Sequence, residues 1–253
     1  VVRAIGWMSY RQLVWLARGA GALVNALPRF RRLTAENLRT AFPEWPEARV
    51  RATRRQVARH MCQTGLELAW FTRHPERASA HFTSVSPAVL EAGRRAASGQ
   101  PMIMVTPHLG NWEMCAQYAR LAAGVPLCAV ARRLRNPGLD RLVNASRTRH
   151  GLELIAERGA MRHMLGALRA GKSLGILIDQ NVLPEHGGEF VEFFGLPVPT
   201  TRAVAMLARR LGVEAACFAC RREGTGFAME MRALPKPVPA YGSDIELTQD
   251  LLR

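Results

Sequence analysis

From residue 102 onward, short apolar runs alternate with segments that carry helical patterns. Because the runs are short and mostly apolar, they predict buried strands at 102–106, 127–131, 152–155, 173–178, 213–220 and 227–234. Helices are predicted between them at 112–123, 139–150, 161–170 and from Thr200 and Thr201 to 211. Such alternation predicts an α/β domain with a largely parallel sheet.

The first quarter of the chain has no strand pattern. One helix is predicted over 1–27, ending at Pro28, a second from Thr34 to just before Ala41, and a third from Pro46 to about Thr72. We therefore predict a helical N-terminal region, 1–72, and an α/β region, 73–253, within one structural domain.

The formal net charge of the chain is +15, which favours an anionic partner. Residues 1–60 hold 12 arginines against three glutamates, mixed with tryptophan and leucine, for example Trp7, Trp15 and Leu16. Amphipathic helices at a membrane surface carry this mixture, whereas nucleic-acid arms are more polar. A helix packed on its own core is the alternative interpretation. No run of 18 apolar residues is present, so we expect no spanning helix here, although an upstream anchor is left open.

The five cysteines are odd in number and irregularly spaced, which favours free thiols in a reducing environment. Cys217 and Cys220 form a single C-x-x-C within an apolar run. Without a second ligand pair, we expect buried structural cysteines and no metal site.

The segment from Thr106 to Glu113 contains the candidate catalytic residues. His108 leaves a predicted strand, Gly110 permits a tight turn, and Glu113 falls in the first turn of the next helix. This geometry is expected to bring the carboxylate of Glu113 onto the imidazole of His108, making a general base. Because no G-x-S-x-G nucleophile motif accompanies the pair, the nucleophile is expected to belong to the substrate. A structural histidine at a helix start is the alternative.

Asp179 ends another predicted strand. In a parallel sheet the carboxyl ends of the strands share one edge, so His108 and Asp179 are expected at the same functional edge.

The segment His108-Leu-Gly-Asn-Trp-Glu113 resembles the H-x4-[DE] motif of the lipid A biosynthesis acyltransferases, the lauroyl/myristoyl transferase family. Further matches, which together span about residues 15 to 250, occur in the same order along the chain: Asn37-Leu38, Ala41-Phe42-Pro43-Glu44, Arg132, Asn136-Pro137-Gly138-Leu139-Asp140, Arg147, Leu177-Ile178-Asp179-Gln180, the run from Gly188 to Gly195, and Thr200 with Ala205, Ala208 and Gly212.

The resemblance implies a glycerophosphate-acyltransferase-like α/β fold. It also implies transfer of a fatty-acyl group from acyl carrier protein, or from coenzyme A, to a hydroxyl of a lipid A precursor or a related membrane glycolipid. No metal or bound cofactor is implied. The implied partners are acyl carrier protein, the glycolipid acceptor and the membrane surface, with no nucleic acid, at the cytoplasmic face of the bacterial inner membrane.

Three alternatives stay open. Another glycolipid, such as a phosphatidylinositol mannoside, is a possible acceptor within the same family. From other classes, a basic nucleic-acid-binding protein explains the charge, and a hydrolase would use the same histidine with water. The family's usual N-terminal anchor helix is shorter here and interrupted by arginine.

The resemblance also assigns roles to residues. His108 is the base and Glu113 its partner, Arg147 binds phosphate or the thioester oxyanion, and Asp179 orients an arginine or a substrate hydroxyl. Arg149 is the alternative to Arg147. The remaining candidates are expected to bind substrate or carrier: Asn111, Arg132, Arg133, Arg135, Arg149, Gln180, Phe193 and Phe194.

Overall fold

The structure is a computed structural model that describes residues 5–74, 77 and 80–253. The chain divides into two compact units, which are described one at a time. The first comprises 1–74 together with 194–196, and the second comprises 75–193 with 197–253. In the residues that the structure describes, no helix combines the length and the apolar character that crossing a membrane requires.

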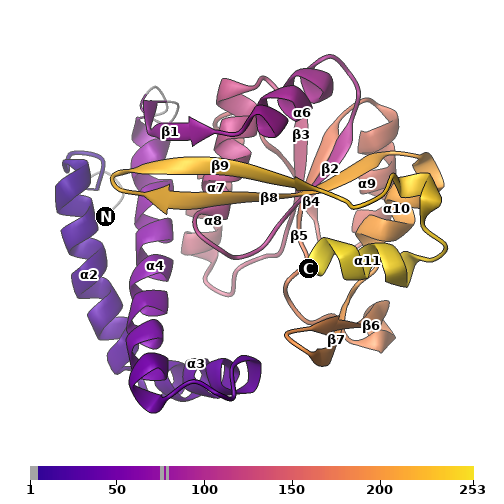
Figure 1. The fold of residues 1–253 in the computed structure, drawn as a ribbon. Helices are drawn as coiled ribbons and strands as arrows, with labels where there is room; N and C mark the ends of the chain where they lie inside the picture. The colour runs from indigo at the N-terminus through magenta and orange to yellow at the C-terminus, as the bar shows by residue number, and fades with distance from the viewer. Residues whose placement is uncertain (1–4, 75–76, 78–79) are drawn as a thin grey trace. The chain divides into compact units, whose positions relative to one another are not determined.

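The described part of the first unit contains the helices α2 (Tyr10–Ala26), α3 (Pro28–Ala41) and α4 (Glu47–Arg73) (Figure 1). The predicted single helix over 1–27 is wrong near its start, because Ser9 caps α2 in a reciprocal capping box with Gln12. Residues 1–4 of that prediction lie outside the described residues. The second helix begins at Pro28 rather than Thr34, since proline suits the first turn. The third predicted helix, from Pro46 to about Thr72, is confirmed by α4.

Helix α2 approaches α4 closely through small residues. Leu13, Ala17 and Gly21 are its buried positions, spaced four residues apart on one face. A Cβ built on Gly21 would lie 2.6 Å from the Cα of Arg59 on α4, so only glycine permits this approach. Aromatic rings close one end of the pair, where Tyr10 meets Trp70 at a centroid distance of 5.7 Å.

The second unit contains a seven-stranded sheet in the order β1-β9-β8-β2-β5-β3-β4. Strands β8, β2, β5, β3 and β4 are parallel, whereas β9 is antiparallel to β8 and pairs in parallel with β1. The predicted α/β class with a largely parallel sheet is confirmed. The strands are β1 (Phe82–Val85), β2 (Met102–Thr106), β3 (Leu127–Ala131), β4 (Glu153–Ala156), β5 (Ser173–Leu177), β8 (Glu214–Glu223) and β9 (Gly226–Ala233).

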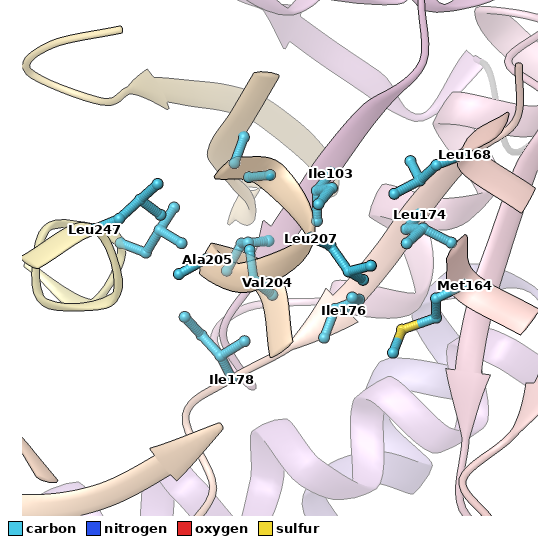
Figure 2. Close-up of a cluster of buried hydrophobic side chains, with 14 of the residues drawn as sticks. Ile103, Met164, Leu168, Leu174, Ile176, Ile178, Val204, Ala205, Leu207 and Leu247 are labelled. Atoms are coloured by element: carbon cyan, nitrogen blue, oxygen red, sulfur yellow. The ribbon is translucent and has the colours of Figure 1, made fainter. Parts of the chain in front are cut away.

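Successive side chains of the central strands point to opposite faces of the sheet, and helices cover each face. On one face Ile103, Leu174 and Ile176 pack against α9 (Ala160–Arg169), α10 (Ala203–Leu211) and α11 (Asp244–Leu252). Figure 2 shows this cluster, with Met164 and Leu168 of α9, Leu207 of α10 and Leu247 of α11 around the strand residues. It forms the dry core of the unit.

The other helices of the second unit are α6 (Pro87–Ala97), α7 (Trp112–Gln117) and α8 (Pro137–Thr148). The helix predicted over 112–123 continues beyond α7 as a five-residue π-helix, η1 (Tyr118–Ala122). Helix α8 begins two residues before the predicted start, because Asn136 caps it with bonds from the backbone N–H groups of Gly138 and Leu139.

The segment after β5, for which no strand was predicted, contains a separate hairpin, β6 (Gly188–Phe193) and β7 (Leu196–Thr201), as well as a short 3-10 turn (Pro184–His186). Thr200, predicted to cap α10, belongs to β7 and donates to the carbonyl of Ile178. Thr201 accepts from the backbone N–H of Ala203 at the start of α10.

Candidate active site

The candidate site lies at the carboxyl ends of β2 and β5, two neighbouring parallel strands near the middle of the sheet. His108 follows β2 by two residues, and Asp179 follows β5 by two residues. The strand register pairs Thr106 with Leu177, so the two loops leave the sheet side by side. The predicted meeting of His108 and Asp179 at one edge is confirmed.

Asp179 holds His108 through both of its carboxylate oxygens. One oxygen lies 2.7 Å from the Nδ1 atom of the imidazole, and the other accepts the backbone N–H of His108 at 2.6 Å. Because a carboxylate only accepts, Nδ1 carries the proton and Nε2 is left as the basic nitrogen. Asp179 therefore fixes both the tautomer and the position of the loop.

The predicted pairing of Glu113 with His108 is wrong. Glu113 is buried in the first turn of α7, and its carboxylate accepts two bonds from Arg147 of α8. The Nε atom of Arg147 lies 3.1 Å from one carboxylate oxygen, and Nη2 lies 2.5 Å from the other. This side-on geometry is the strongest form of the arginine–carboxylate pair. The carboxylate beside His108 is that of Asp179, 71 residues further along the chain.

Two polar contacts tie the His108 loop to strand β8. The backbone N–H of Asn111 donates to the carbonyl of Cys220 at 2.8 Å, and Arg222 donates to the carbonyl of Gly110 at 3.0 Å. Gly110 has a φ of 65°, and a Cβ there would lie 2.1 Å from the Cys220 oxygen. Only glycine allows this approach, which fixes where His108 leaves the sheet.

An apolar pocket lies on the face of the sheet opposite the dry core. The pocket opens to solvent, and most of its lining is apolar. Trp112 links it to the histidine, since the indole lines the pocket and meets the imidazole of His108 edge-on at 4.8 Å. The Glu113–Arg147 pair is also in its wall. The strands contribute mostly small or apolar side chains: Met104, Thr106, Leu127, Ala129, Val130, Ala131, Gly175, Leu177, Phe218 and Met229.

A histidine base, a carboxylate that orients it and an adjacent apolar pocket suit chemistry on a molecule with a long hydrocarbon chain. The family model described as bacterial lipid A biosynthesis acyltransferase matches residues 1–249. The chain belongs to this family. It is accordingly an acyltransferase of lipid A biosynthesis. No curated protein matches the chain in a search by sequence similarity.

Hydrogen bonds keep two charged side chains of the acyltransferase ionised against the effect of burial. Burial alone would raise the pKa of Asp179, but the hydrogen bonds from the ring and backbone of His108 outweigh burial and lower it. Burial likewise opposes the charge of Arg147, and the bonds to Glu113 overcome it and raise the pKa. Both groups are therefore ionised at neutral pH.

The remaining predicted residues divide between buried and exposed positions. Asn111 is fully buried, and its side chain caps α7 by accepting from the N–H of Met114, so it is a structural residue in this conformation. Gln180 is exposed, and its amide nitrogen lies 3.5 Å from Nε2 of His108. Arg149 is exposed at the C-terminal end of α8 and lies outside the ion pair that Arg147 forms.

The basic cluster of Arg132, Arg133 and Arg135 is exposed in the loop that follows β3. Arg132 makes an ion pair of 3.4 Å with Glu157, although both side chains are largely in solvent. Phe193 is half-buried at the end of β6. Phe194 is 54% exposed, has a positive φ of 53° and meets Phe42 edge-on within the first unit.

All five cysteines are free, and Cys115, Cys128 and Cys220 are buried. Cys217, predicted to be buried, is half-buried and donates to the carbonyl of Leu251, while burial raises the pKa of its thiol. Across the described part of the chain, no three His, Cys, Asp or Glu side chains gather as metal ligands would.

Proposed function

We propose that the protein transfers a fatty-acyl group from a thioester, carried by acyl carrier protein or coenzyme A, to a hydroxyl of a lipid A precursor or a related membrane glycolipid. The observation that carries the proposal is the contact of Trp112 with both the His108 ring and the apolar pocket. It places a basic nitrogen one side chain away from a space that suits a hydrocarbon chain. The proposal needs no metal and no bound cofactor.

In the proposed reaction, Nε2 of His108 takes the proton of the acceptor hydroxyl, whose oxygen attacks the thioester carbonyl carbon. The tetrahedral intermediate then collapses, the carbon–sulfur bond breaks, and the departing thiolate receives the proton from His108. Asp179 stabilises the imidazolium that exists between the two steps, because its carboxylate already holds Nδ1–H. This is general-base catalysis with a nucleophile supplied by the substrate.

Arg147 is proposed to stabilise the oxyanion of that intermediate. Its Nε and Nη2 atoms are used by Glu113, and Nη1 donates to no residue that the structure describes. The guanidinium lines the pocket, so a carbonyl oxygen entering there meets a fixed donor. Glu113 is thus a positioning residue for Arg147 rather than a partner of the base.

The exposed residues around the base are proposed to bind the polar parts of the substrates. Gln180 lies within reach of a hydroxyl at Nε2 of His108. The Arg132, Arg133 and Arg135 cluster suits a lipid phosphate or the acidic surface of acyl carrier protein. We propose that the reaction takes place at the cytoplasmic face of the bacterial inner membrane, where Phe193 and Phe194 contact the acceptor or the acyl chain.

The test is acyl transfer by the purified protein in detergent micelles, with acyl carrier protein as donor and a Kdo-bearing tetra-acyl lipid as acceptor. Mass spectrometry of the products gives the mass added and the hydroxyl used. The variant His108→Ala is expected to lose transfer, whereas Leu109→Ala, an exposed neighbour, is the matched control. Full activity of His108→Ala contradicts the mechanism. Transfer only to another glycolipid, such as a phosphatidylinositol mannoside, would show that this glycolipid, and not a lipid A precursor, is the acceptor.

A further inference from the structure

Helix α2 has a second apolar face, separate from the one that packs on α4. Its exposed positions include Trp15 (68% exposed), Leu16 (43%) and Leu23 (74%), and Leu27 (56%) follows directly at its end. Leu16, Leu23 and Leu27 lie seven and four positions apart and Trp15 precedes Leu16, so the four residues form one stripe along the helix. The helix contains no acidic residue, and its two charges are Arg11 and Arg18. We call Trp15, Leu16, Leu23 and Leu27 the exposed stripe.

A hollow rich in arginine begins at the next residue. Pro28, which follows Leu27, lines this shallow, open hollow together with Arg31, Arg32, Arg39 and Arg54 from α3 and α4. We call these five residues, with Ala35, the arginine hollow. All of them, and the whole exposed stripe, belong to the first unit.

The positive charge of the hollow is only partly compensated. Arg39 has a close ion pair with Glu47 at 2.7 Å, whereas the pair of Arg32 and Glu36 is long, at 3.8 Å, and exposed. Arg54 bonds to the neutral amide oxygen of Asn25 at 3.0 Å. Burial and then the positive charge of Arg31 and other neighbours lower the pKa of Arg54, which indicates a local positive potential.

We propose that the exposed stripe and the arginine hollow form one docking surface for an anionic phospholipid bilayer, with a lipid phosphate seated among the arginines. Tryptophan prefers the membrane–water interface, and arginine binds phosphate with several donors in a fixed plane. Arg18 lies 4.6 Å from the ring of Trp15, so its charge stays at headgroup level while the ring meets the acyl chains.

Charge complementarity favours an anionic bilayer over a second copy of the chain or nucleic acid as the partner of this surface. A second copy of the chain would bring two arginine hollows together, which like charges oppose. Nucleic acid would satisfy the arginines but would leave the four large apolar side chains of the stripe in water. A bilayer with anionic headgroups satisfies both. The inference deepens the membrane-surface part of the proposed function, yet it concerns binding alone and does not depend on acyl transfer.

Vesicle flotation of the full chain, without donor or acceptor, tests the inference. We expect binding to vesicles of phosphatidylcholine and phosphatidylglycerol in equal parts and little binding to phosphatidylcholine alone, with weakening as salt rises. Each basic residue near an anionic surface contributes about 1 kcal/mol, so Arg31→Glu with Arg32→Glu is expected to lower the partition coefficient about 30-fold or more. Leu23→Glu should lower it about tenfold.

The matched control is Arg162→Glu with Arg169→Glu on α9, which changes the net charge equally at exposed positions of the second unit. Circular dichroism and thermal unfolding establish that each variant folds. A second measurement needs no charge change: brominated phosphatidylglycerol should quench the fluorescence of wild type more than that of Trp15→Phe.

Several outcomes would overturn the inference. An equal loss of vesicle binding in the Arg31→Glu/Arg32→Glu variant and in the Arg162→Glu/Arg169→Glu control would show that net charge, rather than this surface, determines binding. Equal binding to both vesicle types would show that anionic lipid is not required. Release by inorganic phosphate, but not by chloride of the same ionic strength, would indicate a site for free anions. A dimer in sedimentation equilibrium that buries Trp15 would assign the stripe to a second copy. Loss of acyl transfer with normal flotation would refute only the proposed function.

Discussion

At the scale of single residues, the base of this site is prepared by Asp179. The carboxylate is 18% exposed and uses both oxygens on His108, so the wrong tautomer is suppressed and the ring cannot rotate away. This arrangement assigns the two acidic side chains of the site to different tasks. Asp179 serves the base, and Glu113 serves Arg147.

The first prediction separates these tasks. Asp179→Asn is expected to lower kcat about 10²- to 10⁴-fold, the usual size of a general-base contribution, with little change in KM, because the amide can donate to Nδ1 and favour the wrong tautomer. Steady-state acyl transfer measures the loss. A normal kcat in Asp179→Asn, together with a large loss of kcat in Glu113→Gln at unchanged stability, would show that Glu113, not Asp179, orients the base.

The same carboxylate predicts how stability depends on pH. The pKa of Asp179 is lowered below its ordinary value of 3.8 in the folded state, so its contribution is fully present above that value. It is lost as the pH falls through the lower folded pKa. The difference in free energy of unfolding between wild type and Asp179→Asn should therefore shrink from pH 6 to pH 3, measured by urea denaturation. A difference in free energy of unfolding that stays constant from pH 6 to pH 3 would contradict the lowered pKa of Asp179.

The ion pair of Glu113 and Arg147 gives the third prediction. Their side chains are 9% and 23% exposed, so removing one partner leaves a poorly solvated charge. Arg147→Met is expected to cost about 3 kcal/mol, the lower end for buried pairs, and Glu113→Gln in the same chain should recover part of that loss. Urea denaturation of the double-mutant cycle measures the coupling. Additive effects in both stability and kcat would show that the two residues act independently.

At the scale of elements, the tether between the His108 loop and β8 sets the geometry of the site. Gly110→Ala places a methyl group against the Cys220 oxygen, which must move because the contact of 2.1 Å is with backbone. Gly187→Ala is the matched control, since Gly187 has a φ of 85° but open space around it.

The positive φ alone costs roughly 1–2 kcal/mol, and we expect that cost in Gly187→Ala. Gly110→Ala should exceed it by at least about 1–3 kcal/mol, the usual cost of overpacking, and should also lower kcat. Thermal unfolding and acyl transfer give the two readouts. Equal costs in the two variants would show that the loop can move away from β8 without strain.

Six of the seven strands of the main sheet were predictable because their runs are short and mostly apolar, whereas β1 has no such run and was not predicted. The position of His108 and Asp179 at one edge followed from the ends of two such runs. Their pairing did not, because Glu113 is closer in sequence and nothing in the pattern shows which way it points. The cap at Asn111 starts α7 so that Glu113 faces α8.

The hairpin of β6 and β7 escaped prediction for a different reason. Pro197 and Pro199 argue against a strand, since proline donates no ladder bond, and β7 tolerates them in a two-stranded sheet. The stretch 188–193 contains a detectable signal, since Phe190, Val191 and Phe193 are residue types that strands favour. The turn between the strands depends on the positive φ of Phe194, which no sequence rule predicts for an aromatic residue.

At the scale of the whole second unit, one sheet supports two different interiors. Alternate residues of β5 face opposite ways, so Leu174 and Ile176 fill the dry core while Gly175 and Leu177 line the pocket. Gly175 leaves space on the pocket face, whereas Leu174 and Ile176 fill the core face. An apolar run predicts burial on both faces, but it does not reveal that one face is left partly empty.

Gly175 tests that division. A Cβ there would meet its nearest neighbour, a methyl group of Leu127, at an ordinary 3.8 Å, so a larger side chain fits the strand and projects into the pocket. Gly175→Val is expected to shorten the preferred acyl chain by a few carbons. Each methylene that no longer fits forfeits about 0.8 kcal/mol, close to a fourfold drop in kcat/KM.

Competition between acyl donors of graded length measures this shift, and Ala219→Val on β8, a strand residue outside the pocket wall, is the matched control. Because valine suits a strand, thermal stability should hold or rise in Gly175→Val, which separates a change of specificity from a loss of fold. An unchanged order of preference among donors would mean that the acyl chain lies elsewhere. A fall in kcat/KM that is uniform across all lengths would place Gly175 near the thioester instead of along the chain.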